Sequence, residues 1–364
     1  MIRVPVMTPS RSYEVLIGSG LLSRAGETLG GLLGNRRAFV VTVPPVRRRW
    51  ANVLVKSLKN AGIETGILEM QDGEPAKRLS TLEKLAEKLI AQGADRGITL
   101  IALGGGVVGD VTGFLASIYM RGVDVIQVPT TVLAQVDAAI GGKTGVNLVS
   151  GKNLLGTFHQ PRAVLVDPTV LETLPAREYR AGLYESLKCG IIGDAALFQV
   201  FEDRHKELLK RDPAVVERVI ADSVRLKASV VSADEREGGL RQVLNLGHTI
   251  GHALEAATKY KVLLHGEAVA WGMVAATYLA LSTGKLDSVT AGRIMNAVLG
   301  FGELPRMNVK AANILKLLRS DKKTRQGVVH FILPREIGKV EITSDVPETA
   351  VRAAVDEIRK LARD

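Results

Sequence analysis

The sequence predicts an α/β N-terminal domain with a Rossmann-like, doubly wound, largely parallel sheet, followed by a mostly α-helical C-terminal domain. Short apolar runs alternate with helical patterns over the first 170 residues, which is typical of a parallel sheet covered by helices. Beyond that point the periodicity is mostly helical. The chain of 364 residues also exceeds the usual size of a single core. We therefore expect two domains, residues 1–170 and 171–364, that share a cleft.

Strands and helices are expected to alternate in the first domain. The apolar runs that predict strands cover residues 38–43, 65–70, 98–103, 123–128 and 163–167. Residues 80–93 have apolar spacings of three and four, and Ser80 with Glu83 matches a capping box, so this segment is expected to be a helix. A second helical pattern covers residues 107–119.

The second domain is expected to consist mainly of amphipathic or apolar helices. These cover residues 178–190, 213–232, 247–257, 266–283, 287–299 and 310–319, and two late strands are expected near 328–333 and 338–343.

Composition excludes several classes of protein. No run approaches the roughly 20 apolar residues of a membrane span, and the first residues do not resemble a signal peptide. The single cysteine, Cys189, excludes an intramolecular disulfide and fits a reducing cytoplasm.

The net charge of +10 could indicate nucleic-acid binding, but the one dense basic run, residues 47–50, is expected at the exposed start of a helix. A basic cleft for a small anionic substrate explains the charge better.

A glycine segment after the 98–103 strand suggests nucleotide binding. Gly104, Gly106 and Gly109 form a G-x-G-x-x-G pattern between a strand and a helical pattern. Glycines let the backbone approach a pyrophosphate, and the helix N-terminus offers N–H groups to its charge. This pattern alone is weak, and a tight turn is the alternative. Asp124 is either a ribose ligand or a turn residue.

A second glycine segment, residues 137–147, does not form a P-loop, because Asp137 occupies the position of the first glycine. It carries Asp137 and Lys143 on an expected flexible loop, and the next segment adds Lys152, Asn153 and His159. Such groups suit a phosphorylated or carboxylated substrate. A surface loop with incidental lysines is the alternative.

Four residues of the second domain are candidate metal ligands. His248 and His252 are four residues apart, a spacing that places both on one face of a helix. Glu185 and His265 are the other two candidates. A catalytic zinc usually takes three protein ligands, so one of the four candidates is surplus. Spacing alone does not decide whether the histidine pair provides two ligands, one ligand and one catalyst, or packing.

Eight ordered segments together resemble the 3-dehydroquinate synthase family of sugar-phosphate cyclases. They are DGEPAK (72–77), LGGGVVGD (103–110), VPTTVLAQVDAAIGGKTGVN (128–147), GKNLLGTFHQP (151–161), GLYESLKCG (182–190), RQVLNLGHTIGHALE (241–255), HGEAVAWGM (265–273) and DKKTRQG (321–327).

The resemblance implies conversion of 3-deoxy-D-arabino-heptulosonate 7-phosphate to 3-dehydroquinate and phosphate, a step toward aromatic amino acids. The expected sequence is transient oxidation by NAD, phosphate elimination, re-reduction, ring opening and intramolecular aldol closure. It further implies one divalent metal ion, zinc or cobalt, and a cytoplasmic homodimer that binds neither nucleic acid nor membrane. The alternatives are another sugar-phosphate cyclase and a metal-dependent NAD polyol dehydrogenase.

The resemblance also implies roles for individual residues. The implied metal ligands are Glu185, His248 and His265, with His252 facing the substrate. Residues implied to bind substrate or its phosphate are Asp137, Lys143, Arg121, Asn153, Lys188, Lys227, Arg241, Asn245, His252 and either Lys322 or Lys323. Residues implied to bind NAD are Asp72, Gly73, Glu74, Lys77, Gly106, Val107, Val108, Gly109, Asp110, Thr130, Thr131, Lys143, Lys152, Val170, Leu171, Glu172 and Thr173. Tyr184 replaces the usual small residue before the glutamate, where altered packing without loss of metal is expected.

Overall fold

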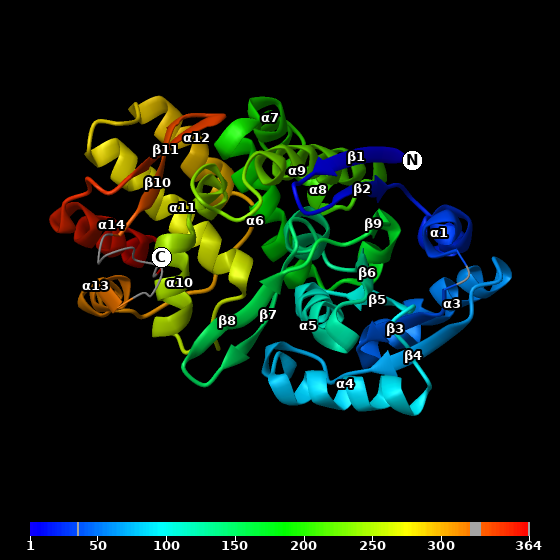
Figure 1. Ribbon diagram of the computed structural model, residues 1–364. Helices are drawn as coiled ribbons and strands as arrows, with labels where there is room; N and C mark the ends of the chain where they lie inside the picture. Colours follow the sequence, from blue (N-terminus) through cyan, green and yellow to red (C-terminus); the bar gives the residue numbers. More distant parts are fainter. Residues whose placement is uncertain (35, 321–328, 363–364) are drawn as a thin grey trace. The chain divides into compact units, whose positions relative to one another are not determined.

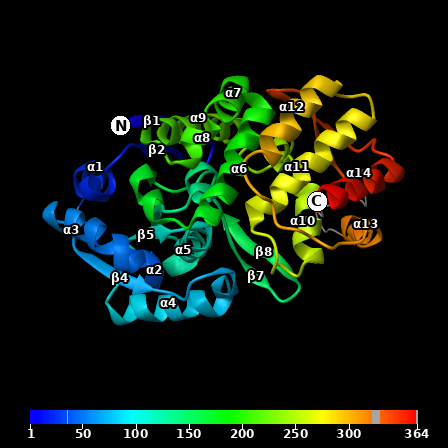
Figure 2. The same ribbon diagram turned by 180° about the vertical axis from the view of Figure 1, so that it is seen from behind.

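The computed structural model describes residues 1–34, 36–320 and 329–362 (Figures 1 and 2). The chain forms two compact units. The first comprises Met1–Pro175 and Val216–Arg236, and the second comprises Ala176–Val215 and Glu237–Asp364. The first break lies close to the expected boundary at residue 170, but Val216–Arg236 belongs to the first unit.

A seven-stranded sheet forms the centre of the first unit, in the order β1-β2-β9-β6-β5-β3-β4. Its strands are β1 (Ile2–Met7), β2 (Ser12–Ile17), β3 (Ala38–Thr42), β4 (Thr65–Glu69), β5 (Thr99–Gly104), β6 (Asp124–Pro129) and β9 (Ala163–Val166). Only β1 and β2 pair antiparallel, and every other neighbouring pair in this sheet is parallel. The structure thus confirms the five expected strands and the largely parallel sheet.

Helices cover both faces of this sheet, as expected for a doubly wound fold. They are α1 (Ala25–Leu33), α2 (Pro44–Val46), α3 (Asn52–Asn60), α4 (Leu79–Ala91) and α5 (Gly106–Ile118). Along β3, Phe39 packs with α4 and α5, whereas Val40 packs with α1 and α3. Successive side chains of a strand point to opposite faces, so one apolar strand contributes to two cores. The basic residues 47–49 are exposed on the helical turn before α3, as expected.

The capping box predicted at Ser80 is wrong. Helix α4 begins at Leu79, one residue before Ser80, with Arg78 at the N-cap position and no capping side chain among the described residues. Ser80 already lies inside the first turn, where its hydroxyl cannot serve as the N-cap.

A two-stranded antiparallel hairpin replaces the flexible loop predicted around Lys143. It consists of β7 (Lys143–Leu148) and β8 (Gly151–Phe158), and β7 packs against α5. Asp137 lies in the helical turn Ala134–Ala138. Glycines allow the close pairing, since a Cβ on Gly156 would lie 1.9 Å from the Thr144 carbonyl oxygen.

Helix α9 (Pro213–Ala233) joins the first unit through polar contacts near its end. Ser232 Oγ accepts a hydrogen bond from the Met7 N–H at 2.9 Å, and Glu235 accepts one from Gln160 at 2.9 Å. Lys227 forms an ion pair with Asp137. These contacts were not visible in the sequence, because their partners are 75 to 225 residues away.

The second unit is mostly helical, as expected. Its helices are α6 (Ala176–Gly193), α7 (Ala195–Asp203), α8 (His205–Leu209), α10 (His248–Ala257), α11 (His265–Ser282), α12 (Ser288–Leu299), α13 (Ala311–Ser320) and α14 (Glu348–Leu361). A hairpin of β10 (Phe331–Glu336) and β11 (Lys339–Thr343) supplies the expected pair of late strands. Among the helices of the described residues, none combines the length and the hydropathy of a membrane-spanning segment.

Asp124 is part of an arginine cluster and lies far from the glycine segment. Its carboxylate pairs with Arg11 and Arg162, each at 3.0 Å, and with Arg36. Strand register places Asp124 beside Thr99, at the opposite end of β5 from Gly104 and roughly 16 Å away. The prediction that Asp124 could contact a ribose beside the glycine segment is therefore wrong.

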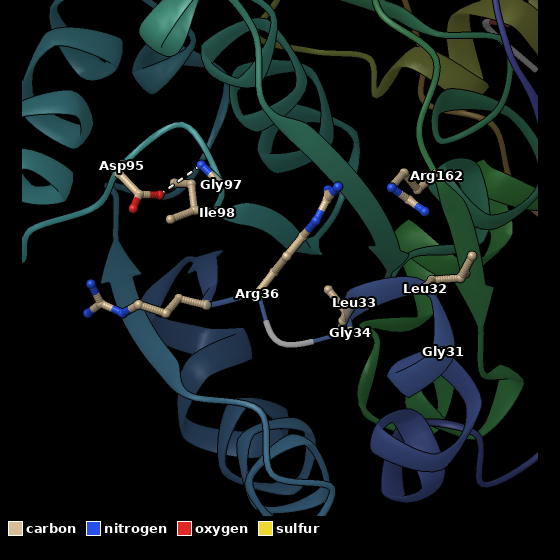
Figure 3. Close-up of a pocket in the computed structure, with 10 residues that line it drawn as sticks. Gly31, Leu32, Leu33, Gly34, Arg36, Asp95, Gly97, Ile98 and Arg162 are labelled. Atoms are coloured by element: carbon tan, nitrogen blue, oxygen red, sulfur yellow. Dashed lines mark hydrogen bonds between the residues drawn. The ribbon is translucent and has the colours of Figure 1, made fainter.

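A cavity of about 520 Å³ lies beside this cluster and is lined by Arg36, Arg37, Asp95 and Arg162 among others. In Figure 3 the Arg36 side chain extends toward Arg162, and Asp95 accepts a hydrogen bond from the Gly97 N–H at 2.7 Å. None of the predicted catalytic, NAD-binding or metal-binding residues lines this cavity.

Replacing Asp124 with asparagine should destabilise the protein by about 2 kcal/mol at pH 7, because three guanidinium groups lose their charged acceptor. Burial alone would raise the pKa of Asp124, but the three arginines hold it below its usual 3.8. The stabilisation is therefore present above the unfolded-state pKa and is lost as the pH falls through the folded-state pKa.

Urea unfolding of wild type and Asp124→Asn from pH 7 to pH 3 measures this difference. The difference in the free energy of unfolding between the two proteins should persist down to about pH 4 and shrink only below that pH. A difference that is already absent at pH 7 would show that the cluster does not stabilise the fold.

Candidate active site and metal centre

Most of the residues expected to bind NAD follow the carboxyl ends of four strands. Residues 72–77 follow β4, residues 106–110 follow β5, Thr130 and Thr131 follow β6, and residues 170–173 lie in the helical turn after β9. The other two, Lys143 and Lys152, lie on the β7–β8 hairpin. The four strands are parallel, so their carboxyl ends share one edge of the sheet. In open α/β sheets, ligands bind at this edge.

Close backbone approach explains the glycines of this edge. A Cβ on Gly105 would lie 3.1 Å from Thr131 Cγ2, and one on Gly104 would lie 2.5 Å from Val108 Cγ2. No described side chain caps the N-terminus of α5. Its first N–H groups are therefore suited to receive a negatively charged group.

Lys77 connects three segments at the same edge. Its ammonium group is buried and donates to both Asp110 at the start of α5 and Asn153 of β8. Asn147 of β7 donates to Glu74 at 2.7 Å and accepts from the Asn153 N–H at 2.9 Å. Burial raises the pKa of Asp110, and the charge of Lys77 offsets this only in part.

A second buried lysine lies in the first unit. Lys227 of α9 donates to the backbone carbonyl of Asp137 at 2.7 Å and to its carboxylate. The structure thus brings together two of the residues that the sequence suggested for substrate binding, from positions 90 residues apart.

Arg121 and His159 lie away from this edge. Arg121 follows the end of α5, whose 13 residues span about 20 Å from the glycine segment. His159 Nε2 lies 2.9 Å from the Val123 carbonyl oxygen, just before β6 begins. Burial lowers the pKa of His159, and its ring is engaged with a backbone carbonyl at the amino end of β6. Lys322 and Lys323 lie outside the described residues.

Three helices of the second unit bring the candidate metal ligands together. Glu185 lies on α6, His248 begins α10 and His265 begins α11. Helix α11 packs against both other helices (Figures 1 and 2). Two glycines of α11 permit this, since a Cβ on Gly266 would lie 1.8 Å from the Ala181 carbonyl oxygen and one on Gly272 would lie 1.8 Å from the Gly247 carbonyl oxygen.

Two histidine nitrogens face one oxygen of a buried carboxylate. Glu185 Oε1 lies 3.8 Å from His248 Nε2 and 3.7 Å from His265 Nε2. Lys188 binds the other carboxylate oxygen, Oε2. Among the described residues, no donor makes a hydrogen bond to the buried Oε1.

Hydrogen bonds at the far side of each ring indicate which nitrogen carries the proton. His248 Nδ1 lies 3.2 Å from the Leu246 carbonyl oxygen, and His265 Nδ1 lies 3.2 Å from Glu255 Oε2. Both partners act as acceptors, so each Nδ1 donates, and Nε2, the nitrogen that faces Glu185, is the atom of each ring that is placed to bind a metal ion.

The environments of the two rings differ. Burial holds the pKa of His248 well below its usual range, with the charge of Lys188 acting in the same direction. Burial also acts to lower the pKa of His265, but the hydrogen bond to Glu255 and the charge of Glu185 raise it overall.

These atoms fit a divalent metal ion. Three acceptor atoms repel one another unless a cation lies between them, and two nitrogens with one oxygen are a common zinc ligand set. Ligand atoms around a tetrahedral zinc are about 3.4 Å apart, close to the separations observed here.

His252 lies in the same cluster. Ligand atoms of His248, His252 and His265 are within 4.8 Å of one another. The ring centroid of His252 lies 5.2 Å from that of His248 and 5.7 Å from that of His265. Proximity alone therefore permits a set of three histidines as well as the set that includes Glu185.

Sequence reasoning missed two acidic residues of this site. Glu255 contacts His265, as described above, and Glu237 accepts a hydrogen bond from Asn245 at 2.9 Å. Glu255 could have been found, because it lies seven residues after His248 on the same helical face. Glu237 has no such periodic signal. Arg241 is buried in the turn that contains Asn245, and this turn packs against α6.

Tyr184 packs away from the cluster, as expected. It is buried, and its ring contacts Phe301 edge-on with centroids 6.2 Å apart. Burial, with the nearby charge of Glu267, raises the pKa of Tyr184 above its usual range.

Two family models match most of the chain. The model for the 3-dehydroquinate synthase N-terminal region matches residues 67–181, and the model for its C-terminal region matches residues 182–324. The 3-dehydroquinate synthase of Koribacter versatilis (strain Ellin345) is 55% identical over 363 residues, which cover 100% of this chain and 99% of the relative.

Two solved structures are similar over nearly the whole chain. The 2-epi-5-epi-valiolone synthase ValA from Streptomyces hygroscopicus subsp. jinggangensis 5008, with NAD⁺ and Zn²⁺ bound, has a TM-score of 0.88 and 32% identity, covering 97% of this chain and 98% of that chain. A 2-deoxy-scyllo-inosose synthase complexed with carbaglucose-6-phosphate, NAD⁺ and Co²⁺ has a TM-score of 0.87 and 27% identity, covering 99% of each chain.

Proposed function

The chain belongs to the 3-dehydroquinate synthase family, and from this premise we propose how its own residues carry out the family's reaction. The reaction converts 3-deoxy-D-arabino-heptulosonate 7-phosphate to 3-dehydroquinate and phosphate. The observation that best supports the proposal is the convergence of Glu185 Oε1, His248 Nε2 and His265 Nε2.

We propose that these three residues hold one divalent metal ion, zinc or cobalt, and that the carboxyl edge of the sheet binds NAD. When bound, NAD supplies a reversible hydride acceptor and the metal supplies a Lewis acid for the substrate's hydroxyl groups. Lys188 orients the Glu185 carboxylate by occupying its second oxygen.

The remaining polar residues are proposed to bind and orient the substrate. Those proposed to hold its hydroxyl and carboxylate groups are Asp137, Lys143, Lys188, Lys227, Arg241 and Asn245. Asn153 and one of Lys322 and Lys323 are proposed to contact the phosphate, whereas the position of Arg121 beyond the far end of α5 does not support that role for it within one chain. Buried cations support this assignment, because Lys188, Lys227 and Arg241 offer positive charge where water is largely excluded.

His252 is proposed to contact the phosphate and to transfer protons beside the metal. It is close enough to His248 and His265 to act on a group held there.

Two alternatives share this architecture. Other sugar-phosphate cyclases, such as the two similar structures, are less similar in sequence, at 32% and 27% identity against 55% for the synthase relative. A metal-dependent polyol dehydrogenase would use the same NAD and metal groups but would release NADH as a product.

Purified protein with NAD and the heptulosonate phosphate should release inorganic phosphate over many turnovers without accumulating NADH. Removal of the metal with a chelator should abolish release, and added zinc or cobalt should restore it. Accumulation of NADH in proportion to substrate consumed, without phosphate release, would instead identify a dehydrogenase.

Substitution of the two neighbouring histidines should separate their roles. His248→Ala should lose at least about 100-fold in metal affinity, together with activity, because it removes a ligand. His252→Ala should retain the metal while turnover falls by about 10²- to 10⁴-fold, the usual contribution of proton transfer.

Metal content and turnover of each purified variant provide the measurement, with His205→Ala on α8 as a control expected to change neither. Equal metal loss in the His248 and His252 variants would refute this division of roles.

We also infer a cytoplasmic homodimer. Large apolar side chains are exposed at the end of α5 and on β8, including Ile118, Leu154 and Phe158. Patches of this kind often mark subunit interfaces. One chain has a mass of 39.0 kDa, so light scattering should give about twice that value; the mass of a single chain would contradict the inference.

A further inference from the structure

A buried carboxylate forms a hydrogen bond with one of the two metal-facing histidines, on the side of the ring that faces away from Glu185. Glu255 lies on α10, is 4% exposed, and its Oε2 is 3.2 Å from His265 Nδ1. His265 is the first residue of α11, and its side chain is 33% exposed against 13% for His248. Surrounding packing therefore restrains the His265 ring less than the His248 ring, and the hydrogen bond to Glu255 provides orientation that packing does not.

The two rings are supported by partners of different charge. His248 donates to a neutral backbone carbonyl, whereas His265 donates to a carboxylate. A carboxylate acceptor makes a stronger, charge-assisted hydrogen bond and makes the opposite nitrogen a better electron donor. It also fixes the tautomer in which Nε2 is free of a proton and faces Glu185.

We propose that Glu255 is a positioning residue of the metal centre, which orients His265 and strengthens it as a ligand without contacting the metal. This inference rests on the proposed metal site. Glu255 also extends the stripe of His248 and His252 along one face of α10, so this helix carries a ligand, a substrate-facing residue and a supporting carboxylate.

The chemistry predicts graded effects of substitution. Glu255→Gln keeps the size of the side chain and an oxygen acceptor but removes the charge, so metal affinity should fall about 10-fold. Glu255→Ala removes the acceptor and should cost about 100-fold, the upper part of the range for such supporting residues.

The experiment is a competition titration of metal-free protein with Zn²⁺ and Co²⁺ against a chelator of known affinity, with the visible absorption of bound Co²⁺ recorded. Glu267→Gln is the matched control. Glu267 is also a buried carboxylate and lies on α11. Within the described residues it accepts hydrogen bonds from Arg177 and from the Leu264 N–H, and from neither metal-facing ring. Thermal unfolding of each metal-free variant shows whether it is folded.

Weaker binding and an altered Co²⁺ spectrum in the Glu255 variants, with Glu267→Gln unchanged, would support the proposal. If Glu255→Ala does not fold, the metal affinity of the isosteric Glu255→Gln variant alone tests the proposal. Wild-type affinity in Glu255→Gln and Glu255→Ala, or equal losses in Glu255→Gln and Glu267→Gln, would overturn it. Failure of the wild type to bind either metal would overturn the metal site itself, which is a distinguishable result.

Discussion

Three hydrogen-bond acceptors converge in the second unit, and the packing of its helices is arranged to hold them there. Glu185 Oε1 faces the Nε2 atoms of His248 and His265, while Lys188 occupies the other carboxylate oxygen. Such a cluster costs free energy unless a cation satisfies it. Close glycine contacts of α11 with α6 and with the start of α10 make the arrangement possible, so the packing of these helices determines where the three candidate ligands lie.

The two edges of the sheet in the first unit differ in composition. At the carboxyl edge, which we propose as the NAD site, α5 begins without a side-chain cap, and the buried Lys77 binds Asp110. At the amino edge, the Asp124 carboxylate forms ion pairs with Arg11, Arg36 and Arg162. Part of the positive charge of the chain therefore stabilises the fold.

Periodicity in the sequence predicted the helices and the parallel strands, because each buries a regular apolar face. It also placed His248 and His252 together, since both lie on one helix. It did not predict the β7–β8 hairpin, which is short of buried apolar residues, or the contact of Lys227 with Asp137, which depends on tertiary folding. Roles within the histidine cluster came from the resemblance to a family and not from spacing, because proximity is similar for all three rings.

The identity of the metal ligands is the central claim, and X-ray absorption of the cobalt-loaded protein tests it most directly. We predict two imidazole nitrogens and at least one carboxylate oxygen bound to the metal, with the same pattern in His252→Ala. Three imidazoles in the wild type that fall to two in His252→Ala would show that His252 is a ligand and would contradict the assignment of Glu185, His248 and His265.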